Sequence, residues 1–193
     1  TKMSTEILQD LTSQALAQAV EGNQRHWVEL NGRLPGVVLH DDVDVLWILS
    51  PTRGRPNQVC SIRIAPERIE ERLDEILGAY RRAQVTANWW LGPGTTPGDL
   101  PGRLRERGLR CFKHVPGLAL NLDSGPFQQL QKAHSIPDGV KIELLEDFSI
   151  FERFPHPDIG KISTKIRRVL LDNYVQLALM EPHKVWPFMA SKD

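Results

Sequence analysis

The strongest pattern in the sequence is one amphipathic helix over residues 66–84. Apolar side chains recur there at helical spacing, which is typical of a helix buried on one side. Its apolar face consists of Ile69, Leu73, Ile76, Leu77 and Tyr80. Pro66 suits the first turn, and acidic residues precede basic ones as the helix dipole favours. The order of the elements around this helix then decides which folds remain possible.

Two helices and three strands are predicted before this helix. The helices cover residues 4–20, with Ser4 or Thr5 as the N-cap, and residues 23–31. The segment Glu21-Gly22-Asn23 is expected to interrupt them. The predicted strands are 37–40, 45–50 and 58–64, and the segment 51–57, rich in Pro, Gly and Arg, is a loop.

The chain after the central helix begins with a predicted strand at 87–91. A glycine-rich loop, a helix with Thr96 as its N-cap that ends at Gly108, and strands at 109–114 and 118–122 follow. The remaining predictions are a linker with a short helix at 127–132, a strand at 140–145, helices at 147–154 and 158–179, and a strand at 185–190.

This order, together with particular residues, resembles the first half of a two-repeat GNAT-superfamily N-acetyltransferase. The residues that carry the resemblance are Asn23, the stretch 89–100, Gly108 and the stretch 116–122. The resemblance implies an α/β (α+β layered) fold with a mixed, largely antiparallel GNAT-like sheet flanked by helices. It also implies a degenerate lobe over 1–125, a linker over 126–138 and the beginning of a second lobe over 139–193. The second repeat rests on element order alone.

Members of this family transfer an acetyl group from acetyl-CoA to an amine. They hold the coenzyme's diphosphate on backbone N–H groups at the start of the central helix, in an Arg/Gln-x-x-Gly-x-Gly/Ala pattern. The matching residues 64–72 contain no glycine, and Pro66 lacks an N–H group. Glu67, Glu70 and Glu71 place carboxylates where phosphates would lie. We therefore expect no catalytic and no cofactor-binding residue here, and no acetyl-CoA bound by this chain.

The resemblance leaves two hypotheses for function. In the first, the chain is the non-catalytic N-terminal lobe, plus the start of the catalytic lobe, of an acetyltransferase whose amine acceptor binds through the missing catalytic half. In the second, it is an inactive module that binds a ligand or protein, or forms a homodimer through residues 158–190, where the apolar stripe of the helix would otherwise be exposed.

Four residues are candidates for lining a cleft between the two halves. They are Asn23, Trp27, Trp89 and Trp90. Core packing for both members of the Trp89–Trp90 pair and a turn role for Asn23 are the alternatives. The loop Gly92-Pro93-Gly94-Thr95-Thr96 could hold an anion, and a tight turn followed by an N-cap is its alternative reading.

Composition excludes several other classes of function. Lys+Arg and Asp+Glu both total 24, so nucleic acid and anionic membranes are not expected partners. The six histidines have no metal-site spacing, and no metal is expected. No segment is long and apolar enough to span a membrane. Cys60 and Cys111 lie in strand-like runs, so we expect two buried free thiols and a reducing cytoplasm.

Overall fold

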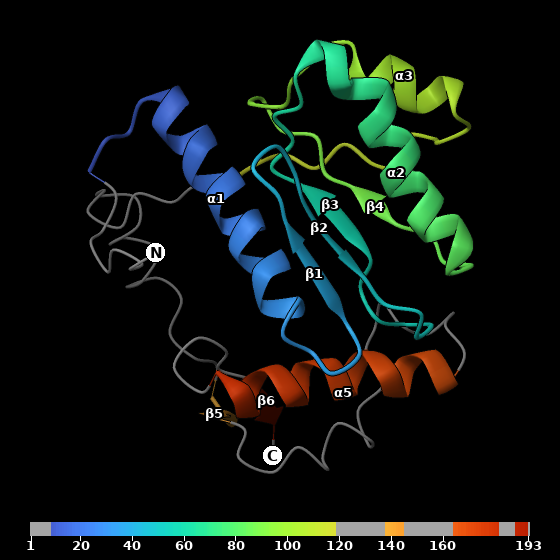
Figure 1. The fold of residues 1–193 in the computed structure, drawn as a ribbon. Helices are drawn as coiled ribbons and strands as arrows, with labels where there is room; N and C mark the ends of the chain where they lie inside the picture. Colours follow the sequence, from blue (N-terminus) through green and yellow to red (C-terminus); the bar gives the residue numbers. More distant parts are fainter. Residues whose placement is uncertain (1–8, 119–137, 145–163, 182–187, 193) are drawn as a thin grey trace.

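The computed structural model describes residues 9–118, 138–144, 164–181 and 188–192 (Figure 1). The helices are α1 (Ser13–Asn31), the 3₁₀ turn η1 (Pro66–Arg68), α2 (Ile69–Arg82), α3 (Leu100–Glu106) and α5 (Thr164–Met180). The strands are β1 (Val38–Asp41), β2 (Leu46–Leu49), β3 (Gln58–Cys60), β4 (Asn88–Trp89), β5 (Val140–Leu144) and β6 (Phe188–Lys192).

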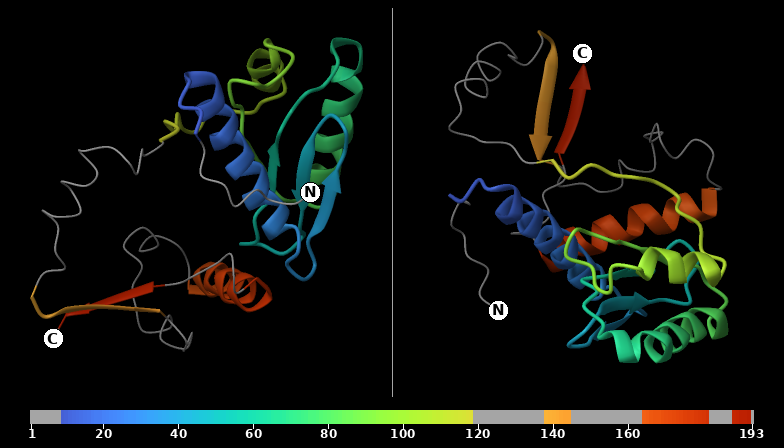
Figure 2. Two further views of the ribbon diagram at one scale, coloured as in Figure 1. Left: turned by 90° about the vertical axis from the view of Figure 1, so that its left-hand side faces the viewer. Right: turned by 90° about the horizontal axis from the view of Figure 1, so that it is seen from above.

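The centre of the molecule is a four-stranded sheet in the order β1-β2-β3-β4. β1, β2 and β3 are antiparallel, and β4 runs parallel to β3, with Val59 opposite Trp89. α1 covers one face of the sheet and α2 and α3 the other (Figures 1 and 2). This is an α+β fold with a mixed, mostly antiparallel sheet flanked by helices, which confirms the predicted fold class.

Alternating residues of the strands feed the two cores, because successive strand side chains point to opposite faces. Leu46, Ile48 and Cys60 pack against Val28 of α1. Trp47 and Val59 belong to the larger cluster on the other face. That cluster contains the predicted apolar positions of α2, namely Ile69, Leu73, Ile76 and Tyr80.

The first helix differs from its prediction. The structure has one helix from Ser13 to Asn31, which runs through the expected break at 21–23, and its N-cap is Thr12, whose side chain accepts from the Ala15 N–H. A glycine inside a helix costs only about 1 kcal/mol, which tertiary contacts can offset. Ser4 and Thr5, the predicted caps, lie outside the described residues.

Two predictions near residue 100 are wrong. Thr96 does not cap a helix, because its backbone hydrogen-bonds to Ile62 and Ile64 instead; Asp99 occupies the N-cap of α3. Residues 109–118 form no strand. The neighbouring β4 is only two residues long and pairs with β3. Residues 110–118 are exposed, and the Phe112 side chain is 94% exposed. Of the strand expected at 118–122, only Leu118 is described.

The described elements after residue 118 are β5, α5 and β6. β5 pairs with β6 in an antiparallel two-stranded sheet. α5 packs on the end of α1, where Leu177 joins Leu30 and Leu34 (Figure 1). The helices expected at 127–132 and 147–154, and residues 126–137 of the linker, lie outside the described residues, so the domain boundaries stay predictions. No helix in the described ranges is long and apolar enough to cross a membrane.

Candidate functional site

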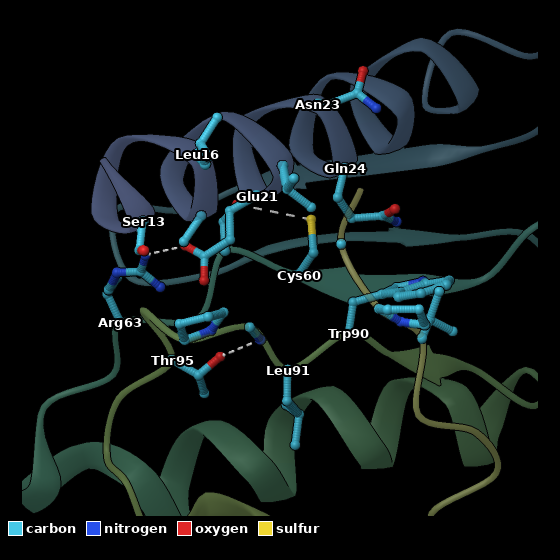
Figure 3. Close-up of a pocket in the computed structure, with 18 residues that line it drawn as sticks. Ser13, Leu16, Glu21, Asn23, Gln24, Cys60, Arg63, Trp90, Leu91 and Thr95 are labelled. Atoms are coloured by element: carbon cyan, nitrogen blue, oxygen red, sulfur yellow. Dashed lines mark hydrogen bonds and ion pairs between the residues drawn. The ribbon is translucent and has the colours of Figure 1, made fainter. Parts of the chain in front are cut away.

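A cleft of about 720 Å³ lies between the first half of α1 and the loop that connects β4 to α3 (Figure 3). Residues 115–117 complete its wall. The side chains that line it include Leu16, Val20, Glu21, Gln24, Arg63 and Trp90.

The cleft exists because two parallel segments of the sheet separate and then rejoin. The Trp90 N–H donates to Val59 O at 2.9 Å, and the next backbone hydrogen bond between the segments runs from Thr96 N to Ile62 O at 3.1 Å. Between these bonds Ser61 takes the left-handed conformation, with φ of 53°. Residues 91–95 therefore form a loop beside α1.

Glu21 of α1 is held by this loop. Its carboxylate accepts the Gly94 N–H at 2.7 Å through one oxygen, and Arg63 Nη2 donates to the other at 2.8 Å. A Cβ atom at Gly92 would collide with the Glu21 carboxylate, and one at Gly94 would collide with the Arg63 guanidinium and then with Glu21, so glycine at both positions leaves room for this ion pair. The loop closes on itself, because Gly92 N–H donates to Thr95 Oγ1 at 3.0 Å. Figure 3 shows Glu21 pointing from α1 towards Arg63.

The remaining wall is largely apolar. Val20, Trp90 and Leu91 are 38%, 36% and 39% exposed, although each lines a concave site. Cys60 lies at the back of the cleft, and burial raises the pKa of its thiol, which keeps it protonated and unreactive at neutral pH. The Gln24 Nε2 atom is buried and has no hydrogen-bond partner among the described residues.

The four predicted cleft residues separate in the structure. Asn23 and Trp90 are among the lining residues, although Figure 3 shows the Asn23 side chain pointing away. Trp27 instead packs beside Tyr174, with ring centroids 6.2 Å apart, and Trp89 packs on the α2 side of the sheet. The two neighbouring tryptophans therefore face opposite sides, one in the core and one in the cleft.

Glu21 and Arg63 are the residues that sequence reasoning missed. The available signal is Gly92-Pro93-Gly94, for which the sequence allows either a tight turn before an N-cap or a loop that holds an anion. The anion that the loop holds is the Glu21 carboxylate, which lies 73 residues before Gly94 in the chain. Nothing in the spacing of these residues indicates that Glu21 and Gly94 meet, because an unbroken α1 is needed to bring them together.

The start of α2 does not fit a coenzyme diphosphate. Pro66 has no N–H to give, and the Arg68 N–H is already donated to Ala65 O at 2.9 Å. The Glu70 carboxylate accepts hydrogen bonds from Arg103 and Arg107 of the α3 region, which hold its pKa below the usual range. Arg103 and Arg107, two cations that could attract a phosphate, are thus engaged by a carboxylate of this chain.

The cysteines and histidines add no second centre. In the part of the chain that the structure describes, no group of three or more His, Cys, Asp or Glu side chains could hold a metal ion. Cys60 is buried as expected, but Cys111 is exposed because the strand predicted around it does not form. Both thiols are free.

Comparison with protein-family models, with curated proteins and with solved structures gave no match.

Proposed function

We propose that the chain is a non-catalytic lobe of the GNAT N-acetyltransferase type, which binds a small molecule rather than the diphosphate of acetyl-CoA. The resemblance of residues 89–100 and 116–122 suggests the family, and the sequence of helix, three antiparallel strands, helix and parallel strand is compatible with it. In a lobe of this kind the cleft beside α1 would shape an acceptor site, while acetyl transfer would take place elsewhere.

One observation carries the non-catalytic part of this proposal. The α2 start is glycine-free and acidic, and its Glu70 is bound by Arg103 and Arg107. Anion binding at a helix start needs free N–H groups and positive potential; here Pro66 has no N–H, the Arg68 N–H is engaged, and three carboxylates lie at residues 67, 70 and 71.

Calorimetric titration of the chain with acetyl-CoA tests the proposal. We expect no saturable heat up to about 1 mM coenzyme. Saturable binding in the micromolar range that is lost in the Arg103→Met/Arg107→Met variant would contradict it, because those two side chains would then hold the diphosphate. Arg82→Met, which removes an exposed cation at the other end of α2, is the matched control.

Self-association through α5 is the second candidate, and the exposure of that helix favours it. Tyr174, Leu179 and Met180 are 50%, 66% and 41% exposed. Sedimentation equilibrium should show a dimer that Leu179→Lys dissociates. Val43→Lys changes a fully exposed valine between β1 and β2 and should leave the dimer intact. A monomer at all concentrations would reject this candidate.

A further inference from the structure

We propose that Arg63 and the loop 92–95 form a receptor for the carboxylate of a small organic acid with an apolar body. In this arrangement the Glu21 carboxylate is an internal competitor for the same site. The inference rests on the geometry of the cleft alone and does not depend on the acetyltransferase resemblance.

The contacts of Glu21 define the chemistry of the receptor. One oxygen accepts a backbone N–H from Gly94, and the other accepts a charge-assisted hydrogen bond from Arg63. Two donors, one on each oxygen, suit a planar carboxylate. The absence of side chains at Gly92 and Gly94 lets the carboxylate come close to the main chain.

Glu21 is easily replaced in this position. The side chains of Arg63 and Glu21 are 46% and 22% exposed, so an incoming anion can reach the pair. Partly exposed ion pairs of this kind contribute little net stability, since solvent screens them and both side chains lose freedom. A ligand carboxylate would form the same two bonds, while Glu21 would turn out into water on its rotatable side chain.

The apolar walls of the cleft would give a ligand binding energy that lets it displace Glu21. Val20, Trp90 and Leu91 expose apolar surface into a concave site, and Leu16 extends this surface along α1. An apolar ligand body would cover it. Each buried methylene group should strengthen binding about fourfold.

Gln24 gives an independent indication of a ligand. Its side chain lines the same cleft, and its buried Nε2 atom has no partner among the described residues. Buried donors are normally satisfied, so this amide has an unused hydrogen-bonding capacity next to the cleft. A hydroxyl or carbonyl oxygen on the body of the acid would satisfy it once the Gln24 amide turned into the cleft.

The alternative is that Glu21, Arg63 and Gly94 only fasten α1 to the sheet. Binding of butyrate, hexanoate and octanoate to Glu21→Ala separates the two explanations, because removal of an internal competitor strengthens ligand binding, whereas removal of a structural contact does not. We expect octanoate to bind Glu21→Ala at least about tenfold more tightly than the unchanged chain. Affinity should rise with chain length, and octylammonium and octanol should not bind.

Two further variants complete the design. Glu29→Ala removes another α1 carboxylate, paired with Arg25 outside the cleft, and should bind octanoate like the unchanged chain. Glu21→Ala/Arg63→Met should lose the gain. Should Glu21→Ala fail to fold, Glu21→Gln gives the same test with the helix side chain retained. Equal affinities of the unchanged chain and the Glu21 variant, a gain that survives loss of Arg63, or no binding at all would overturn the proposal. None of these outcomes bears on the acetyl-CoA titration.

Discussion

Tyr80 joins the helix layer to the sheet through its hydroxyl group. The O–H donates to Ile48 O of β2 at 2.7 Å, and burial raises the pKa of the phenol, so it stays protonated. Tyr80→Phe removes this bond and leaves a buried carbonyl with one acceptor site unfilled. We expect a loss of about 1–2 kcal/mol in the free energy of unfolding, measured by urea denaturation.

Tyr174→Phe is the matched control, because Tyr174 is 50% exposed and should change stability by less than about 0.5 kcal/mol. Equal effects of the two substitutions would show that the Tyr80 hydroxyl contributes nothing specific.

Arg72 makes stability depend on pH. It is 5% exposed and pairs with Asp42 at 2.6 Å, with Asp44 at 3.1 Å and with Glu75. The hydrogen bond from Arg72 holds the pKa of the Asp42 carboxyl below its usual range. A carboxyl whose folded pKa is lowered contributes stability above its unfolded pKa, about 4, and this contribution is lost as the pH falls through the folded value.

We therefore expect Arg72→Met to lose about 3 kcal/mol of unfolding free energy at pH 7, because the buried Asp44 loses its 3.1 Å hydrogen bond and keeps only the longer ion pair with Arg68, at 3.6 Å. The difference from the unchanged chain should shrink when urea denaturation is repeated at pH 3. A difference that is independent of pH would mean that Arg72 stabilises the fold by packing alone.

Single residues also mark the limit of prediction from sequence. The opposite orientations of Trp89 and Trp90 follow from the period of a strand. The pairing of Glu21 with Arg63 spans 42 residues and depends on the path of a helix that sequence reasoning divides in two. A local sequence pattern therefore predicts which way neighbouring strand residues face, but it does not predict which distant residues pair.

At the scale of elements, α1 contains a glycine that its contacts tolerate. Gly22 lies inside the helix, and a Cβ built there would meet nothing within 4 Å. Gly22→Ala should raise the free energy of unfolding by about 0.5–1 kcal/mol, because alanine loses less conformational freedom than glycine when it folds into a helix.

Gly36→Ala is the contrasting case. Gly36 also has open space around it, but its φ of 74° is strained for alanine, so the substitution should destabilise the chain. Thermal melts of both variants measure the effects, and stabilisation by both would contradict this reasoning.

The elements near the central helix could be predicted because each has a strong local pattern. Residues 66–84 became η1 and α2, the predicted strands at 45–50 and 58–64 contain β2 and β3, and the one at 37–40 overlaps β1, which ends one residue later. The expected strand at 109–114 failed for a reason that no local pattern contains. A strand needs a hydrogen-bonding neighbour, and the short β4 does not provide one there.

At the scale of the whole molecule, Leu177 couples α5 to the end of α1. It is 1% exposed and packs with Leu30 and Leu34. Leu177→Ala should lower the free energy of unfolding by about 2–4 kcal/mol. Leu179→Ala, on an exposed position of the same helix, should cost less than about 0.5 kcal/mol. Hydrogen exchange of α5 amides would detect the loosening first, and an effect of Leu179→Ala as large as that of Leu177→Ala would show that this face of α5 is wrongly assigned.

The parallel arrangement of β3 and β4 has a consequence for the time course of folding. β1, β2 and β3 meet through short connections, whereas β4 can join only after α2 has formed and carried the chain back along the sheet. Closing such a long connection costs more entropy than closing a hairpin. We expect the β1-β2-β3 meander to form before β4 pairs with β3. The cleft beside α1 would then be the last part of the described fold to mature, and a nascent chain would complete it only after residues 115–117, which close its wall, have emerged from the ribosome.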